Sequence, residues 1–189
     1  KMLQVLADLA AQPHEEDDEL SPMLVARDVN RVEIVHITPD RGLCGGLPGN
    51  LNRKIYDFIS HGDAPTSVVA VGKKGRNFVV RSGYDLRAEF TDLGDRPSLA
   101  DTLDVSHAIV SDYLSGFADR VYLLYPQFVS MAVQKPVMRQ ILPVQPAELS
   151  VGQAVGYIYE PDSTSVLKAL LPRFVEMEVY QSILETIAS

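Results

Sequence analysis

Short apolar runs alternate along this chain with longer segments whose apolar residues recur every three or four positions. The runs at 32–37, 67–71 and 121–129 are typical of buried strands, and a more exposed strand is expected at 84–90. The segment 137–144 can pair antiparallel with 121–129 through a turn at Gln134-Lys135-Pro136. Strands that alternate with helices predict a parallel sheet with helices on both faces. We therefore predict a three-layer α/β/α, Rossmann-like domain with a mostly parallel sheet and an antiparallel edge.

The helical period marks the segments between the strands. One helix is expected to begin near Leu51, and a short one is expected around residues 76–81. The next helix begins after Ser98, which is a candidate N-cap residue with Asp101 three positions later. Its apolar face is expected to consist of Leu99, Leu103, Val110, Leu114 and Phe117.

Both ends of the chain carry helical patterns of their own. Residues 1–12 have apolar side chains at helical spacing and resemble the last turns of a longer helix. Near the other end, a short helix is expected through Leu171, and Pro172 fits the first position of a new helix, where its missing N–H is not needed. That helix is apolar on more than one face, which a single contact surface does not bury. We divide the chain into a helix end at 1–12, a globular α/β domain at 13–160 and a helical segment at 161–189.

Composition narrows the possible classes of function. The net charge of −8 and the pI of about 4.9 argue against nucleic-acid binding, which depends on an excess of Lys and Arg. No apolar run reaches the ~20 residues that cross a bilayer, so we expect no direct membrane insertion. The chain has one cysteine, which excludes an internal disulfide.

A glycine-dense turn follows the first predicted strand, between residue 37 and the helix that begins near Leu51. A strand, a glycine-rich turn and a helix N-terminus together are typical of phosphate sites. The P-loop pattern is absent, because no Lys-Ser or Lys-Thr follows any glycine. The dinucleotide pattern also fails, because the second strand ends in Gly72-Lys73-Lys74 instead of an acidic residue. The turn is best interpreted as a tight bend that needs glycine, and a small-molecule or phosphate-binding module using Gly42–Gly49 remains the alternative.

Candidate catalytic and metal-binding residues are few. Cys44 lies near a helix N-terminus and is a candidate nucleophile, with His36 or His107 as its base. His36, however, alternates with apolar strand residues, and His107 falls on the polar side of its helix, so we interpret both as structural. His14 next to the acidic residues at 15–18 has neither zinc-ligand spacing nor the glycine of a calcium loop. We predict no catalytic residue, no cofactor and no metal.

The glycine turn is also the first of four motifs that point to one family. Residues 40–47 read D-R-G-L-C-G-G-L, which resembles the signature of the gamma subunit of F-type ATP synthases. The other motifs resemble that family's central strand with its hairpin and its run into the C-terminal helix. They are Y-L-L-Y at 122–125 with V-Q-K-P at 133–136, Y-I-Y-E-P-D at 157–162, and L-L-P-R-F-V-E at 170–176. The resemblance covers nearly all of residues 20–189.

The resemblance implies a non-catalytic rotor subunit. In this family the gamma subunit is the central stalk that couples proton flow through the membrane ring to ATP synthesis or hydrolysis at the catalytic beta subunits. The implied partners are the epsilon subunit, the membrane c-ring, and the alpha and beta subunits of the catalytic ring. The implied location is peripheral, on the cytoplasmic face of the cell membrane. The two terminal helices would be truncated parts of an antiparallel coiled coil.

The resemblance also implies that the glycine turn binds a partner protein. Arg41 is expected to face an acidic loop of a beta subunit, because its guanidinium can hydrogen-bond a carboxylate in bidentate fashion. The glycines are expected to set the shape of the turn. The expected partner-binding residues are Asp40, Arg41, Gly42, Leu43, Cys44, Gly45 and Gly46.

Overall fold

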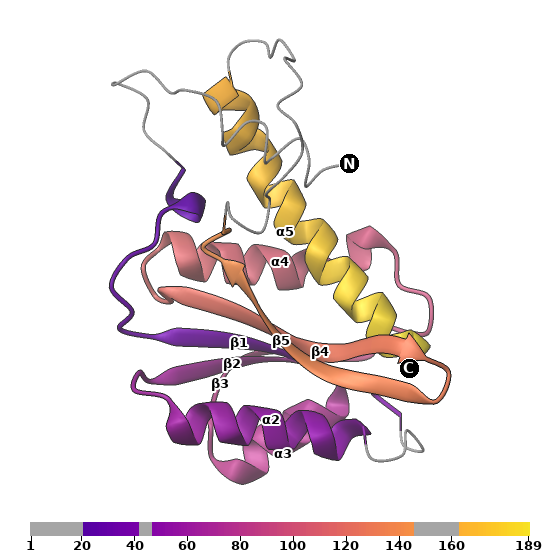
Figure 1. The fold of residues 1–189 in the computed structure, drawn as a ribbon. Helices are drawn as coiled ribbons and strands as arrows, with labels where there is room; N and C mark the ends of the chain where they lie inside the picture. Colours follow the sequence, from indigo (N-terminus) through magenta and orange to yellow (C-terminus); the bar gives the residue numbers. More distant parts are fainter. Residues whose placement is uncertain (1–20, 42–46, 146–162) are drawn as a thin grey trace.

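The protein is represented by a computed structural model, which describes residues 21–41, 47–145 and 163–189. One five-stranded sheet has the strand order β3-β2-β1-β4-β5. Helices α2 and α3 cover one face of the sheet, and α4 and α5 cover the other (Figure 1). The three-layer α/β/α architecture is as predicted. The predicted helix end at 1–12 lies outside the described residues.

The sheet is parallel except at one edge. Strand β1 pairs in parallel with both β2 and β4, and β2 pairs in parallel with β3. Strands β4 and β5 form an antiparallel hairpin, which confirms the predicted edge. The turn predicted at Gln134-Lys135-Pro136 is wrong, because these residues pair with β4 and the chain turns at Met131-Ala132. The strand bounds are Val32–Ile37 for β1, Thr66–Val71 for β2, Asp85–Phe90 for β3, Arg120–Ser130 for β4 and Val133–Leu142 for β5.

The helices begin where local chemistry favours them. At the start of α4, Ser98 accepts a hydrogen bond from Asp101 N, and the Asp101 side chain accepts one from Ser98 N, so the predicted cap is a full capping box. Helix α3 ends at Gly83, whose φ of 73° suits a left-handed C-cap. The bounds are Pro22–Leu24 for the 3-10 turn η1, Leu47–His61 for α2, Lys73–Ser82 for α3, Leu99–Leu114 for α4 and Ser163–Ala188 for α5.

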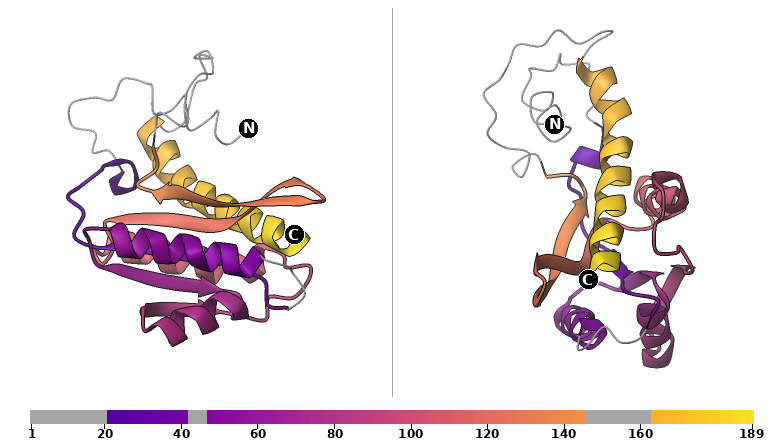
Figure 2. Two further views of the ribbon diagram at one scale, coloured as in Figure 1. Left: turned by 60° about the horizontal axis from the view of Figure 1, so that its bottom comes forward. Right: turned by 90° about the vertical axis from the view of Figure 1, so that its right-hand side faces the viewer.

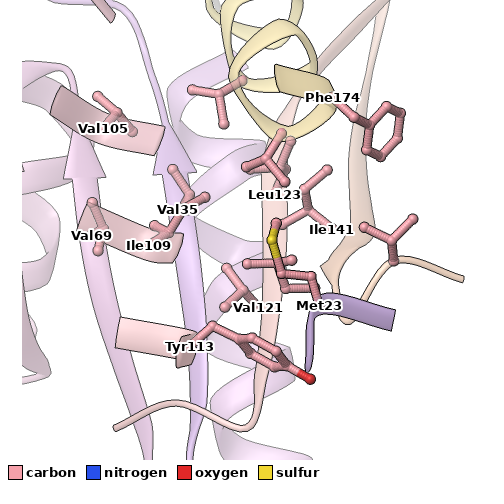
Figure 3. Packing of buried hydrophobic residues seen from close by; sticks show 14 of the residues in the cluster. Met23, Val35, Val69, Val105, Ile109, Tyr113, Val121, Leu123, Ile141 and Phe174 are labelled. Atoms are coloured by element: carbon pink, nitrogen blue, oxygen red, sulfur yellow. The ribbon is translucent and has the colours of Figure 1, made fainter. Parts of the chain in front are cut away.

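Two hydrophobic cores lie on the two faces of the sheet. The smaller core joins Ile34 and Val68 of the sheet to Leu51 and Ile55 of α2 and to Val79 of α3. The larger core lies under α4 and α5. Figure 3 shows part of it, with side chains from the strands, both helices and η1 packed together. Its labelled members are Met23, Val35, Val69, Val105, Ile109, Tyr113, Val121, Leu123, Ile141 and Phe174.

The buried face of α4 differs from the expected one. Val105, Ile109 and Tyr113 are buried, whereas Leu114, which was expected on the apolar face, is 52% exposed. The apolar residues of this helix alone do not define one face, because Thr102, Ser106 and Asp112 are also buried there. The buried polar side chains shift the contact face away from the position that hydrophobicity predicts.

The predicted break before Pro172 is wrong, because α5 is one 26-residue helix that contains this proline. Proline inside a helix removes one hydrogen bond to the preceding turn. A row of buried side chains, one per turn, holds the helix in place on both sides of it. That row consists of Leu167, Leu171, Val175, Val179 and Ile183. Burial of this row on the sheet and α4 offsets the lost hydrogen bond, and Figure 2 shows α5 as a single rod beside the sheet.

Polar contacts fix α5 on several sides. Arg139 of β5 pairs with Glu178, and the Tyr180 hydroxyl donates to the carbonyl of Pro97 at 3.1 Å. Phe128 N of the β4–β5 hairpin donates to Glu185 Oε2 at 3.2 Å. These contacts, together with the buried row, oppose both sliding and rotation of α5. Within the described ranges, no helix is long and apolar enough to cross a membrane.

Helix α3 lies close to the end of β1, and Gly75 makes this possible. A Cβ at position 75 would lie 2.7 Å from His36 Cδ2 and 2.8 Å from Thr38 Cγ2. We expect Gly75→Ala to lower the free energy of unfolding by about 1–3 kcal/mol, because α3 must move away from β1. The matched change is Gly49→Ala in α2, where a Cβ meets nothing within 4 Å. There we expect no loss, or a gain of up to about 1 kcal/mol.

Urea unfolding of both variants would measure this difference. Equal midpoints for Gly75→Ala and the unchanged protein would contradict the tight contact between α3 and β1.

Candidate functional site

The residues expected to bind a partner lie at the carboxyl end of β1. The structure describes two of them, Asp40 and Arg41. Gly42, Leu43, Cys44, Gly45 and Gly46 lie outside the described residues. In open α/β sheets, functional groups collect at the carboxyl ends of the strands, and Asp40 and Arg41 lie at that edge.

Asp40 joins three segments of the chain. Its Oδ1 accepts a hydrogen bond from Lys73 N at 2.8 Å, at the start of α3. Its Oδ2 accepts one from Asp92 N at 3.1 Å, in the loop after β3. A carboxylate at a helix N-terminus is stabilised by the free N–H groups and by the helix dipole. Asp40 therefore fixes the point from which the glycine turn leaves the sheet.

The side chain of Arg41 is mostly exposed instead. Its NH2 group lies 2.8 Å from Asp95 Oδ2, and the two side chains are 78% and 66% exposed. An ion pair so exposed contributes roughly 0–1 kcal/mol to stability. The guanidinium can therefore exchange Asp95 for another carboxylate at little cost to the fold.

An open cleft of about 510 Å³ lies at this edge of the sheet. Asp40 and Arg41 line it together with Lys73, Asp92 and Asp95, and the last turn of α5 forms one side. A second ion pair, between Lys73 Nζ and Asp92 Oδ1 at 2.7 Å, lies next to the Arg41–Asp95 pair. The cleft thus carries two ion pairs and a third carboxylate, that of Asp40, which is bound by backbone N–H groups.

The cleft is a poor site for phosphate at the start of α3. Lys73 N already donates to Asp40, and Gly75 N donates to Thr38 Oγ1 at 2.7 Å. Lys74 N approaches the carbonyl of Pro39 at 3.4 Å. The first N–H groups of α3, which would otherwise bind an anion, are therefore satisfied within the chain. The carboxylates around them would also repel a phosphate.

Three residues of the cleft were not anticipated from the sequence. Lys73, Asp92 and Asp95 follow β2 and β3, and the carboxyl ends of these strands meet the end of β1 at one edge. A charged residue soon after each predicted parallel strand was the signal that could have identified them.

The two histidines considered as bases have structural surroundings. His36 is fully buried, and its Nε2 lies 3.0 Å from Asn52 Oδ1, so the tautomer with hydrogen on Nε2 donates to the amide oxygen. Burial lowers the pKa of His36 from 6.5 to about 4, while the Asn52 contact raises it slightly, so the ring is neutral. His107 lies on α4 with its Nε2 3.5 Å from Glu176 Oε1 of α5. In the described part of the chain, no group of three His, Cys, Asp or Glu side chains could hold a metal.

Comparisons with known proteins give one consistent result. A family model described as ATP synthase matches residues 1–189. The ATP synthase gamma chain of Dehalococcoides mccartyi strain CBDB1 is 52% identical over 189 residues, which is 100% of this chain and 66% of that relative. The gamma chain of Roseiflexus castenholzii is 45% identical over 164 residues, which is 85% of this chain and 57% of that relative. The chain therefore spans two thirds of the length of these relatives at most.

A solved structure has a similar fold. It is the central stalk and c-ring of the mitochondrial ATP synthase of Tetrahymena thermophila, and the matching chain has a TM-score of 0.69 at 17% identity. The match covers 99% of this chain and 78% of that chain. At this level of identity the similarity shows the shared fold alone.

Asp40 and Arg41 should respond differently to substitution. We expect Asp40→Ala to lower the free energy of unfolding by about 1–2 kcal/mol, because Lys73 N and Asp92 N lose their acceptor. We expect Arg41→Ala to change it by less than about 0.5 kcal/mol, because the Asp95 pair is exposed. Chemical denaturation with an unchanged m-value would measure both. A large loss of stability in Arg41→Ala would mean that this arginine holds the fold together.

Proposed function

Because this chain belongs to the family of ATP synthase gamma chains, we propose that it works as part of the central stalk of a rotary, proton-driven ATP synthase. The observation that carries the proposal is the family match over residues 1–189. The fold shared with a chain of the Tetrahymena central stalk supports it. In this role the chain couples ion flow through the membrane ring to ATP synthesis or hydrolysis in the catalytic subunits.

The proposed role is mechanical and non-catalytic. A stalk must transmit torque, which requires a helix that cannot turn freely within its domain. Helix α5 meets this requirement. Its buried row packs against the sheet and α4, and its Glu178, Tyr180 and Glu185 side chains each bind a different segment of the domain. At ~1.5 Å per residue, its 26 residues extend roughly 40 Å. A rod of this length, fixed along one side, can carry a rotation from the domain to a distant partner.

The stalk would act on the catalytic subunits by changing the populations of their conformational states. An asymmetric stalk makes different contacts with each catalytic subunit in turn, and those differences favour one state of each subunit over the others. The nucleotide sites would then lie on the partners. Within the described residues, His36 Nε2 is held by Asn52, and Asp40 is held by two backbone N–H groups.

We propose the epsilon subunit, the c-ring, and the alpha and beta subunits as partners, with a peripheral location on the cytoplasmic face of the membrane. The Tetrahymena structure combines a central stalk with a c-ring, which supports the ring as one partner. The proposed division of the chain remains a coiled-coil segment at 1–12, a globular domain at 13–160 and a C-terminal helical segment at 161–189.

We also propose that residues 40–46 bind a beta subunit. Asp40 would act from inside by fixing the base of the turn, and Arg41 would act from outside by binding a carboxylate of the partner. The exposure of Arg41 and its surface pairing with Asp95 support this division of roles, because the intramolecular carboxylate already shows the chemistry that the partner would supply.

Complex formation tests the proposed function. Mixed with the epsilon subunit of the same source, the chain should elute as a stable complex in size-exclusion chromatography with light scattering. ATP should leave its melting temperature unchanged, since no ligand linkage is expected. The opposite pair of results, a melting temperature that rises with ATP and no complex with epsilon, would favour the phosphate-binding module at Gly42–Gly49.

Substitution of Arg41 in the assembled synthase tests the proposed beta contact. We expect Arg41→Ala to weaken the affinity of the full-length gamma chain for the catalytic ring by about tenfold, because a charge-assisted hydrogen bond is lost. Arg41→Lys should restore only part of it, since an ammonium cannot bind a carboxylate in bidentate fashion. The matched control is Arg81→Ala, at the exposed end of α3.

Proton pumping per ATP hydrolysed should fall in Arg41→Ala and stay normal in Arg81→Ala. Equal proton pumping per ATP in the two variants would show that Arg41 is not part of the proposed interface. The rotor function would still be tested by complex formation with the epsilon subunit.

A further inference from the structure

A charged cluster lies between the sheet and α4, at the opposite end of β1 from the cleft. Its three members come from three elements: Glu33 from β1, Arg87 from β3 and Asp112 from α4. Glu33 is 0% exposed and Asp112 is 9% exposed. Arg87 binds Asp112 in bidentate fashion, with Nε 3.2 Å from Oδ2 and NH2 3.0 Å from Oδ1.

A β-bulge directs Arg87 toward α4. The pairing of β2 with β3 shifts after Val68, which lies opposite Leu86, so that Val69 lies opposite Ala88 and Arg87 has no partner in the register. An extra residue of this kind re-aims its side chain. The Arg87 guanidinium also lies 3.8 Å from the centroid of the Phe117 ring, which holds it against the α4 layer. The Nε and NH2 groups of Arg87 are therefore both engaged by Asp112.

Glu33 is left with a carboxyl group and no donor. Among the described residues, nothing donates a hydrogen bond to either of its carboxyl oxygens. The Asp112 carboxyl acts on the pKa of Glu33 as a hydrogen-bond partner and as a negative charge, and two carboxyl groups can share a hydrogen bond only when one of them carries a proton. If both were ionised, a single guanidinium would face two buried negative charges, which is costly.

The neighbouring Arg31 does not neutralise the second carboxyl group of the cluster. Arg31 pairs with Asp85 at 3.3 Å, and the Ser67 hydroxyl of β2 lies between them, accepting from Arg31 and donating to Asp85. On the β4 side, the residue paired with Glu33 is the apolar Val121. Burial first, and then the hydrogen bond and negative charge of Asp112, raise the pKa of Glu33 from 4.5 to about 9, against the lowering effect of Arg87.

We propose that Glu33, Asp112 and Arg87 form a proton-binding site, in which one proton shared between the two carboxyl groups fastens helix α4 to the sheet. With the proton bound, the cluster is neutral and Glu33 donates to Asp112. When the proton leaves to solvent, two carboxylates face each other and α4 loosens. Because α4 carries Val105, Ile109 and Tyr113 into the larger core, the loosening reaches the packing beneath α5. The site does not depend on the proposed rotor function.

Infrared spectroscopy of the unchanged protein tests the site directly. A carbonyl band from a protonated carboxyl group should be present near neutral pH and should disappear with a midpoint of about 9. The band should be absent from Glu33→Gln and retained in Glu89→Gln, which makes the same chemical change at an exposed position of β3. Absence of the band near neutral pH, or its persistence in Glu33→Gln, would overturn the proposal. Since the titration uses the unchanged protein, it remains decisive even if Glu33→Gln fails to fold.

The dependence of the unfolding equilibrium on pH tests whether the shared proton fastens α4 to the sheet. The unfolded chain releases this proton near pH 4.5 and the folded chain holds it to about 9, so the folded state loses stability as pH rises through that window. Relative to Glu33→Gln, whose amide can donate to Asp112 at every pH, the unfolding equilibrium constant of the unchanged protein should rise about tenfold per pH unit. Protection of α4 amides from hydrogen exchange should fall above pH ~9 in the unchanged protein alone. Parallel stability curves for the two proteins would refute the shared proton.

Discussion

Strand β1 is covered on both faces, and this burial is the constraint on which the rest of the structure depends. All six of its residues are buried, so the polar side chains that it carries can find partners only inside the protein. His36 meets Asn52 of α2, and Glu33 faces Asp112 of α4. The central strand thereby determines which residues the two helical layers must present to it. Its carboxyl end then places Asp40 and Arg41 at the edge where the cleft forms.

The two ends of β1 carry charged groups of different kinds. At the carboxyl end, the chain places exposed charges that pair loosely and can exchange partners, as Arg41 does with Asp95. At the other end, Glu33 and Asp112 are buried beneath α4, and the Arg87 that binds Asp112 is half-exposed. In a central stalk, one end would meet other subunits while the other end keeps the domain stiff enough to carry load. The sheet between them is shared by both.

Much of the fold was predictable because it rests on local patterns. The strand–helix alternation, the antiparallel edge and the Ser98 cap depend on residues close together in the sequence, and all three were predicted. The burial of Leu114 and the break at Pro172 were predicted wrongly, because contacts with distant elements decide them. Nothing near Arg41 indicates Asp95, which lies 54 residues away. The position of Arg87 depends on a β-bulge that no local motif marks, although an acidic residue inside the apolar run V-E-I-V-H-I was a signal that a buried partner exists.

The two hydrogen bonds of Asp40 have a mechanical consequence. A force applied to the chain at Arg41 does not pass into β1 alone, because Asp40 also holds the first turn of α3 and the loop after β3. The pull is divided among three segments that belong to three neighbouring strands of the sheet. The start of α3 and the loop after β3 are each loaded through one hydrogen bond and β1 through the covalent chain, so no single strand end must bear the whole force. A thrust on the glycine turn would therefore be spread across the width of the parallel sheet before it could peel β1 away from its neighbours.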